Sequence, residues 1–123
     1  MANLFTKAGE SSVDNLIAGN KVFMKSVAGT LPASATGYTR GMPLTVSDAG
    51  AWTKAATQIH GILLDDVPIS TDPTEVPIAL TGEFNQNVMD LTSLGANANT
   101  AIIRARDKQI YIAPMNQAPF VQI

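Results

Sequence analysis

Apolar and polar residues alternate along much of the chain and predict a series of short β-strands. Met42–Val46 alternates in this way, and Pro43 fits there only at a strand start or an edge because it has no N–H to donate. Ala28–Gly41 is rich in Gly, Pro, Ser and Thr and predicts a loop. We expect strands at Lys21–Val27, Met42–Val46, around Trp52, at Gln58–Val67, Val76–Asn85 and Gln109–Pro114, the last ended by its proline.

The most regular strand pattern is Val76–Asn85, whose apolar face consists of Val76, Ile78, Leu80, Gly82 and Phe84. Gly82 predicts a bulge or a close backbone approach where the strand bends. Phe84 is then expected to return to the core, and Asn85 to cap the following turn. Glu83 is expected to point away from the core, free to meet solvent or another protein. We expect Gly61, Gly82, Phe84 and Asn85 to define the fold.

Helical spacing appears only in the last third of the chain. Val88, Leu91 and Leu94 follow a helical period that Gly95 would end as a C-terminal cap. A second run begins at Asn99 or Thr100 and is compatible with a helix to about Lys108. The whole pattern predicts one mainly β domain with one or two short helices.

Composition narrows the function classes. The chain has 123 residues, 46% hydrophobic and 15% charged, which fits one globular domain. The low charged fraction favours an oligomer or a subunit of a larger assembly. With a net charge of −2 and no run of Lys or Arg, it offers no basic stripe for nucleic acid. The absence of Cys excludes disulfides and thiolate metal sites, and no apolar run reaches membrane-spanning length.

Candidate chemistry is sparse. His60 is the only histidine, so catalytic triads and paired-histidine metal sites lack partners. Calcium at the acids between Asp65 and Glu75 and a glycosidase pair of Asp65 or Asp66 with Glu83 are open alternatives, but their spacing fits turns better. No phosphate-binding glycine loop occurs. We expect no catalytic residue, no cofactor and no metal, and hence a structural role.

Residues Met1–Ser12 lack sustained periodicity around an apolar pair, Leu4 and Phe5. They predict either a mobile terminus or an arm that becomes ordered on a partner by adding a strand to its sheet. The start has no secretory signal, so synthesis in the cytosol is expected. The domain boundaries that follow are an arm at residues 1–13 and a β-rich domain at residues 14–123.

Five short segments carry a resemblance to a known family: NLIAG (Asn15–Gly19), RGMPL (Arg40–Leu44), HGILLDDV (His60–Val67), GEFN (Gly82–Asn85) and KQIYIAP (Lys108–Pro114). In their order and spacing they resemble the small head-decoration proteins of tailed bacteriophages, of the lambda type. Pro43 departs from the plain β-former usual there, and Ser47–Thr57 does not match position by position.

The resemblance implies a small β-barrel-like domain, the β-tulip, with a flexible N-terminal arm. It implies a non-enzymatic virion protein, made in the cytoplasm of the host bacterium, that forms homotrimers on the outer surface of the expanded head. The trimers would bind the major capsid protein at threefold and quasi-threefold sites and stabilise the head against the pressure of packaged DNA. No nucleic acid or membrane is an expected partner. The expected capsid-binding residues are Ala2, Asn3, Leu4, Phe5, Thr6 and Lys7.

Two other functions stay open at this level. One is a different phage surface module, such as a tail, fibre or adhesion protein. The other is a small enzyme or carbohydrate-binding domain, which the chain equips poorly because only 6% of its residues are aromatic.

Overall fold

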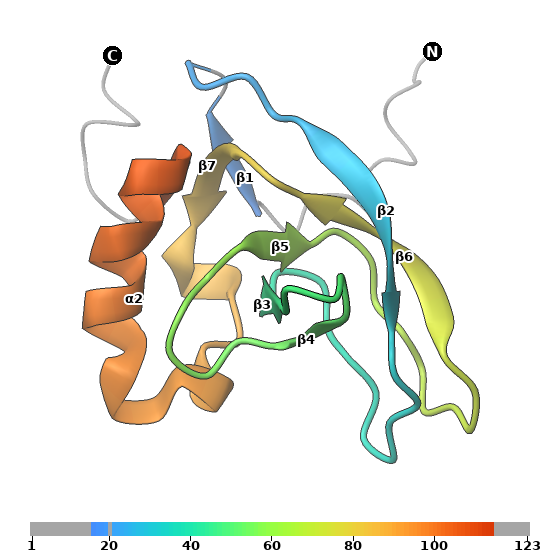
Figure 1. The fold of residues 1–123 in the computed structure, drawn as a ribbon. Helices are drawn as coiled ribbons and strands as arrows, with labels where there is room; N and C mark the ends of the chain where they lie inside the picture. Colours follow the sequence, from blue (N-terminus) through green and yellow to red (C-terminus); the bar gives the residue numbers. More distant parts are fainter. Residues whose placement is uncertain (1–15, 20, 115–123) are drawn as a thin grey trace, which may run out of the picture.

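The protein is described by a computed structural model over residues 16–19 and 21–114, which form one small, mainly β domain (Figure 1). The predicted arm, residues 1–13, lies outside this range, so its boundary stays a prediction. The elements of the described part are β1 (Ile17–Gly19), β2 (Ser26–Leu31), β3 (Pro43–Val46), β4 (Trp52–Lys54), β5 (Gly61–Leu63), β6 (Thr74–Ala79), β7 (Gly82–Asn85), η1 (Gln86–Val88), η2 (Thr92–Asn97), α2 (Ala98–Ala105), η3 (Arg106–Lys108) and β8 (Ile110–Ala113).

One sheet has the antiparallel strand order β2-β6-β5-β3-β4 and curls into half a barrel (Figure 1). Its longest pairing joins β2 to β6, with Ser26 opposite Ala79 and Leu31 opposite Thr74. Pro43 is the first residue of β3, one of the two places predicted for it. The hydrophobic cluster of this sheet consists of Leu31, Tyr38, Met42, Leu44, Trp52, Leu63, Val67, Val76 and Ile78.

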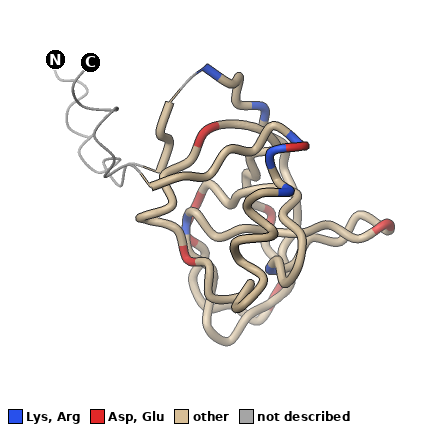
Figure 2. The backbone as a smooth tube through the Cα atoms, turned by 90° about the vertical axis from the view of Figure 1, so that its left-hand side faces the viewer, with Lys and Arg blue, Asp and Glu red and all other residues tan. Residues whose placement is uncertain are grey.

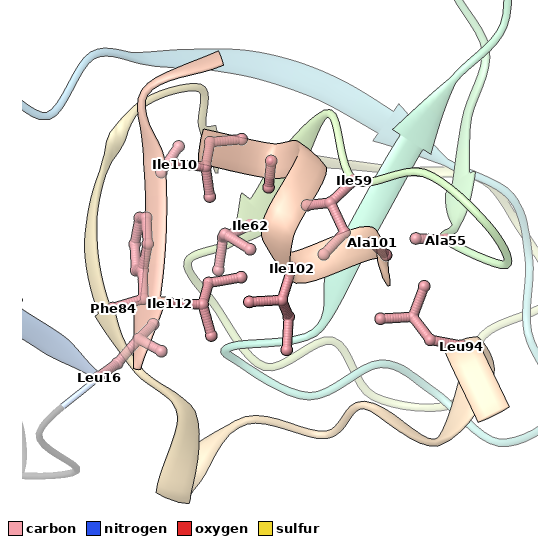
Figure 3. Close-up of a cluster of buried hydrophobic side chains, with 12 residues drawn as sticks. Leu16, Ala55, Ile59, Ile62, Phe84, Leu94, Ala101, Ile102, Ile110 and Ile112 are labelled. Atoms are coloured by element: carbon pink, nitrogen blue, oxygen red, sulfur yellow. The ribbon is translucent and has the colours of Figure 1, made fainter. Parts of the chain in front are cut away.

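A second sheet has the order β1-β7-β8, with β1 antiparallel and β8 parallel to the central β7. Parallel neighbours need a crossover connection, and the helical residues between β7 and β8 supply it. A second cluster joins α2 to both sheets through Ile102, Ile112, Phe84 and Ile62, which point toward one another in Figure 3. The strands and α2 therefore enclose two adjoining cores, which agrees with the predicted mainly β, barrel-like fold.

The predicted single strand through Val76–Asn85 is two strands, β6 and β7, which belong to different sheets. The chain changes sheet at Leu80 and Thr81. The Leu80 N–H donates to the carbonyl oxygen of Lys25 at 2.7 Å, and the Thr81 hydroxyl donates to that of Phe23 at 2.5 Å. Gly82 follows with a φ of 145°. The predicted bend is present, but it transfers the chain between sheets instead of forming a bulge.

β2 also differs from its prediction, because it begins at Ser26 and continues through Leu31 into the stretch expected to be a loop. The preceding residues 21–25, here called the strap, bond to side chains at the start of β7 instead of a strand. Inside β2, Gly29 is required by packing: a Cβ there would lie 2.7 Å from Cδ1 of Trp52. Gly29 belongs to a stretch that the sequence predicts to be a loop, but in the structure its missing side chain leaves room for the Trp52 indole.

The remaining elements follow the pattern in part. The strands expected at residues 42–46, at Trp52 and before Pro114 are confirmed as β3, β4 and β8, and β5 is a shorter strand inside Gln58–Val67. The run to Lys108 is helical, although α2 begins slightly before the expected cap. The helix expected over 88–94 is wrong: two 3₁₀ turns stand there, separated by an extended Met89. No helix in the described part is long and apolar enough to cross a bilayer.

Candidate functional site

The four positions expected to define the fold lie where two backbones approach closely or the chain turns. A Cβ on Gly61 would lie 2.6 Å from Cγ2 of Ile78, so β5 and β6 could not pack as they do. Phe84 is buried between the second sheet and α2. The Asn85 side chain accepts a hydrogen bond from the N–H of Asn87 at 3.0 Å and caps η1.

The surroundings of His60 disfavour its protonated form, which a catalytic histidine must adopt during the reaction. Its Nδ1 lies 2.7 Å from Oγ1 of Thr45 and accepts the N–H of Val46 at 3.3 Å. Burial lowers the pKa of His60, and the positive charge of Lys108 lowers it further. A catalytic histidine needs a group that stabilises its cation, and the neighbouring lysine does the opposite. Thr45 and His60 therefore form a structural hydrogen bond between β3 and the residue before β5.

The acids that suggested calcium do not assemble a site. Asp66 accepts the backbone N–H of Arg40 at 2.8 Å through Oδ1, whereas Asp65, Asp72 and Glu75 are exposed. Across residues 16–19 and 21–114, no three acid or histidine side chains come together as metal ligands would. Asp66 thus fixes the turn that precedes β3.

Glu83 has a structural partner, which corrects the expectation that its carboxylate is free for solvent or another protein. Its Oε2 accepts the N–H of Val22 at 2.8 Å, and the Lys25 N–H donates to Oγ1 of Thr81 at 2.9 Å. A charge-assisted bond of this kind is stronger than a neutral one. The carboxylate therefore anchors the strap to β7. The sequence offered no local signal for this contact, because strap and β7 are far apart along the chain.

Two hollows remain as candidate binding places. A polar groove of about 420 Å³ runs between the segment before β5 and α2, and its charged lining consists of Arg104, Asp107 and Lys108. An apolar hollow of about 300 Å³ lies over the second sheet, lined by Ala18, Val22, Glu83, Phe84, Tyr111 and Ala113. We call the second one the root hollow, because it adjoins β1, where the described chain begins. It offers aromatic and aliphatic contact area beside the residues that follow the predicted arm.

The expected capsid-binding residues Ala2, Asn3, Leu4, Phe5, Thr6 and Lys7 lie outside the described residues. Within the described part, the polar groove and the root hollow are the candidate binding places. In comparison with known proteins, no protein-family model matches the chain, and no curated protein matches it.

Proposed function

We propose that the protein is a capsid decoration protein of a tailed bacteriophage. It binds the outer surface of the expanded head as a homotrimer at threefold and quasi-threefold sites, and its partners are the major capsid protein and itself. By bridging neighbouring shell subunits it resists the internal pressure of packaged DNA. A trimer contacts several shell sites at once, so later contacts become intramolecular and weak individual contacts sum to stable binding.

Segments that carry the resemblance are far apart in the sequence but meet in space. NLIAG leads into β1, GEFN is β7, and KQIYIAP contains β8, and these three strands form one sheet. RGMPL enters β3 and HGILLDDV contains β5, which are neighbours in the other sheet. Unrelated short matches would not be expected to fall on paired strands, and this placement is the main support for the proposal.

The surface of the described part also supports a role in assembly. The root hollow is largely apolar and adjoins β1, so a partner that binds the arm could also cover Tyr111 and Val22. Interfaces draw much of their affinity from such aromatic positions. We propose that residues 2–7 contact the capsid and that the root hollow extends that contact.

Co-sedimentation with shells tests the proposal. Purified protein is mixed with expanded shells and with unexpanded precursor shells assembled from the cognate major capsid protein. We expect saturable binding to expanded shells alone. Failure of the full chain to bind expanded shells would contradict decoration.

The arm is tested separately by deleting Met1–Ser12. We expect the deletion to abolish shell binding while circular dichroism shows an unchanged β domain. A matched pair of variants sharpens the test: Leu4→Ser with Phe5→Ser removes the apolar anchor, and the control Glu10→Gln changes a polar residue of the arm outside residues 2–7. Unimpaired binding of the deletion variant would show that the arm is not the contact.

A further inference from the structure

The charged residues of the described part are distributed unevenly. Five of its seven Lys and Arg residues lie in the strap and in the segment from the end of α2 to η3, namely Lys21, Lys25, Arg104, Arg106 and Lys108. Figure 2 shows blue positions gathered in the upper part of the molecule. We call residues 21–25 and 103–109 the basic end.

Hydrogen bonds to the start of β7 bring the two segments of the basic end together. The Gly82 N–H donates to the carbonyl oxygen of Gln109 at 2.9 Å, and Thr81 bonds to the strap from the other side. A shallow hollow between them is lined by Phe23, Lys25 and Gln109. The acids within or beside this region are Asp107 and Glu83, and the Glu83 carboxylate already accepts the N–H of Val22. The strap and the end of η3 therefore meet at Gln109, and the two segments of the basic end carry five positive charges against these two acids.

Away from the basic end, the antiparallel pair of β2 and β6 continues beyond its sheet as two loops joined by a bridge between Ser34 and Ser70, at the lower right of Figure 1. We call residues 30–37 and 68–75 the acidic finger, because they include Asp72 and Glu75 and contain no Lys or Arg. Ser34 and Ser70 exchange backbone hydrogen bonds of 3.2 and 3.1 Å across it. The Tyr38 hydroxyl donates to the carbonyl oxygen of Pro32 at 2.8 Å. The finger is thus an ordered projection that loses little freedom when it binds.

Both surfaces carry an apolar anchor beside their charges. Among the described large apolar side chains, the most exposed are Phe23 at 78%, Ile69 at 69% and Ile103 at 58%. Phe23 and Ile103 belong to the basic end, and Ile69 belongs to the acidic finger. An apolar centre with a charged rim is the usual composition of a protein interface, and here the two rims have opposite signs.

We propose that the acidic finger of one copy docks on the basic end of a second copy, with Ile69 against Phe23 and Asp72 and Glu75 facing Lys21 and Lys25. The contact joins two different surfaces, so a docked pair still has one free finger and one free basic end. Repeated contacts of this kind close into a ring or continue as a filament, depending on the rotation between copies. The inference rests on the proposed function for the closed trimer, and it identifies the surfaces that form it.

A second copy fits this pair of surfaces better than another partner. Nucleic acid would favour the basic end but would be repelled by the finger, whereas each surface finds its complement on the same molecule. The turn between β3 and β4 also carries an acid, Asp48, but its neighbours Ser47, Ala49, Gly50 and Ala51 offer no apolar anchor. Asp48 is therefore a matched control for charge alone.

Charge reversal with restoration tests the contact by sedimentation equilibrium of the full chain. We expect Asp72→Lys with Glu75→Lys, and separately Lys21→Glu with Lys25→Glu, each to weaken self-association by roughly tenfold or more, because attraction becomes repulsion. The chain with all four substitutions has both signs exchanged, and we expect its self-association to recover to near the wild-type level. The control Asp48→Lys should leave it unchanged. All five positions are exposed, and circular dichroism checks that each variant is folded.

An apolar pair of variants keeps the test decisive if a charge variant fails to fold. Phe23→Ser and Ile69→Ser should each weaken self-association by about tenfold or more, since buried aromatic and aliphatic anchors dominate interface affinity. Val88→Ser, at a residue that is 40% exposed outside both surfaces, is the control. Unchanged mass in the reversal variants, no recovery in the folded fourfold variant, or a monomeric wild-type chain at every concentration would overturn the inference.

Shell binding of the same variants separates this inference from the proposed function. Wild-type self-association that the reversals disrupt, in a chain that does not bind expanded shells, would support the contact and contradict decoration. If the chain binds shells but the charge reversals do not change its self-association, the result would support decoration and overturn the contact. Open-ended polymers that the reversals disrupt would support the contact and contradict the closed trimer.

Discussion

Replacing Gly82 by alanine tests the point where the chain passes from one sheet to the other. Gly82 has a φ of 145°, a backbone conformation that residues with a Cβ rarely adopt. The added Cβ would also lie 3.0 Å from Cζ of Phe84, whose side chain is 1% exposed. The methyl group of alanine at this position would therefore destabilise the fold in two ways, through the backbone conformation and through the contact with Phe84.

The size of each cost can be estimated from the structure. An unfavourable backbone conformation costs of order 1–3 kcal/mol, and forcing a methyl group into a packed core costs about 1–3 kcal/mol. We expect Gly82→Ala to lower the free energy of unfolding by roughly 2–5 kcal/mol, out of a total of about 5–15 kcal/mol for a domain. Urea denaturation followed by the fluorescence of buried Trp52 measures the change.

Gly50 provides the matched control for the backbone cost. It has a φ of 87°, and a Cβ there would meet no heavy atom within 4 Å, so Gly50→Ala changes the backbone term alone. A double-mutant cycle with Phe84→Leu isolates the packing term, because the shorter side chain leaves room for the new methyl group. The reasoning is refuted if Gly82→Ala costs no more than Gly50→Ala, or if Phe84→Leu does not reduce its cost.

Two further predictions concern the groups that sequence reasoning considered for chemistry. Glu83→Gln should weaken the bond to the Val22 N–H, lower the free energy of unfolding by about 1–2 kcal/mol and speed hydrogen exchange at Val22. Glu75→Gln is the control. Equal exchange rates at Val22 in the two variants would contradict the anchoring of the strap by Glu83. His60 has a pKa lowered from 6.5 in the folded protein, so unfolding takes up a proton and stability should fall as pH decreases below about 6.5. Urea midpoints between pH 7.5 and 5 check this, and an equally steep pH dependence in His60→Gln would assign it to another group.

Sequence reasoning predicted elements whose signal is local. Alternation identified β3 and β8, and a glycine in an apolar pattern identified the bend at Gly82. The predicted start of β2 was wrong because the strap has the alternating pattern of a strand, but its backbone N–H groups bond to the side chains of Thr81 and Glu83. The bonds from Val22 to Glu83 and from Lys25 to Thr81 join residues 61 and 56 positions apart, and no local pattern encodes such a distance.

The predicted helix over 88–94 failed for a related reason. Its apolar residues do not all face the core: Leu94 is buried and Leu91 packs against the same cluster, whereas Val88 is 40% exposed. Asn85 caps η1 directly, and the Asp90 carboxylate accepts the N–H of Thr92 at 3.1 Å, so side chains satisfy the backbone groups that a helix would pair. Gly95, expected just beyond a helix, has a φ of 52° within η2. The hydrogen bonds from the Asn85 and Asp90 side chains therefore favour two short turns over one continuous helix.

For the candidate site, the composition led to the expectation of no catalytic or metal-binding residues, and the exposed surfaces could be located only from the structure. Gly29 shows why. In the sequence it belongs to a run of small residues that reads as a loop, but in the sheet its missing side chain leaves space for the Trp52 indole and allows β2 to pair with β6. That antiparallel pair continues beyond the core and carries Asp72, Glu75 and Ile69 out on the acidic finger. The packing of Gly29 against Trp52 thus contributes to the position of the acidic finger, which the pattern of charges along the chain does not indicate.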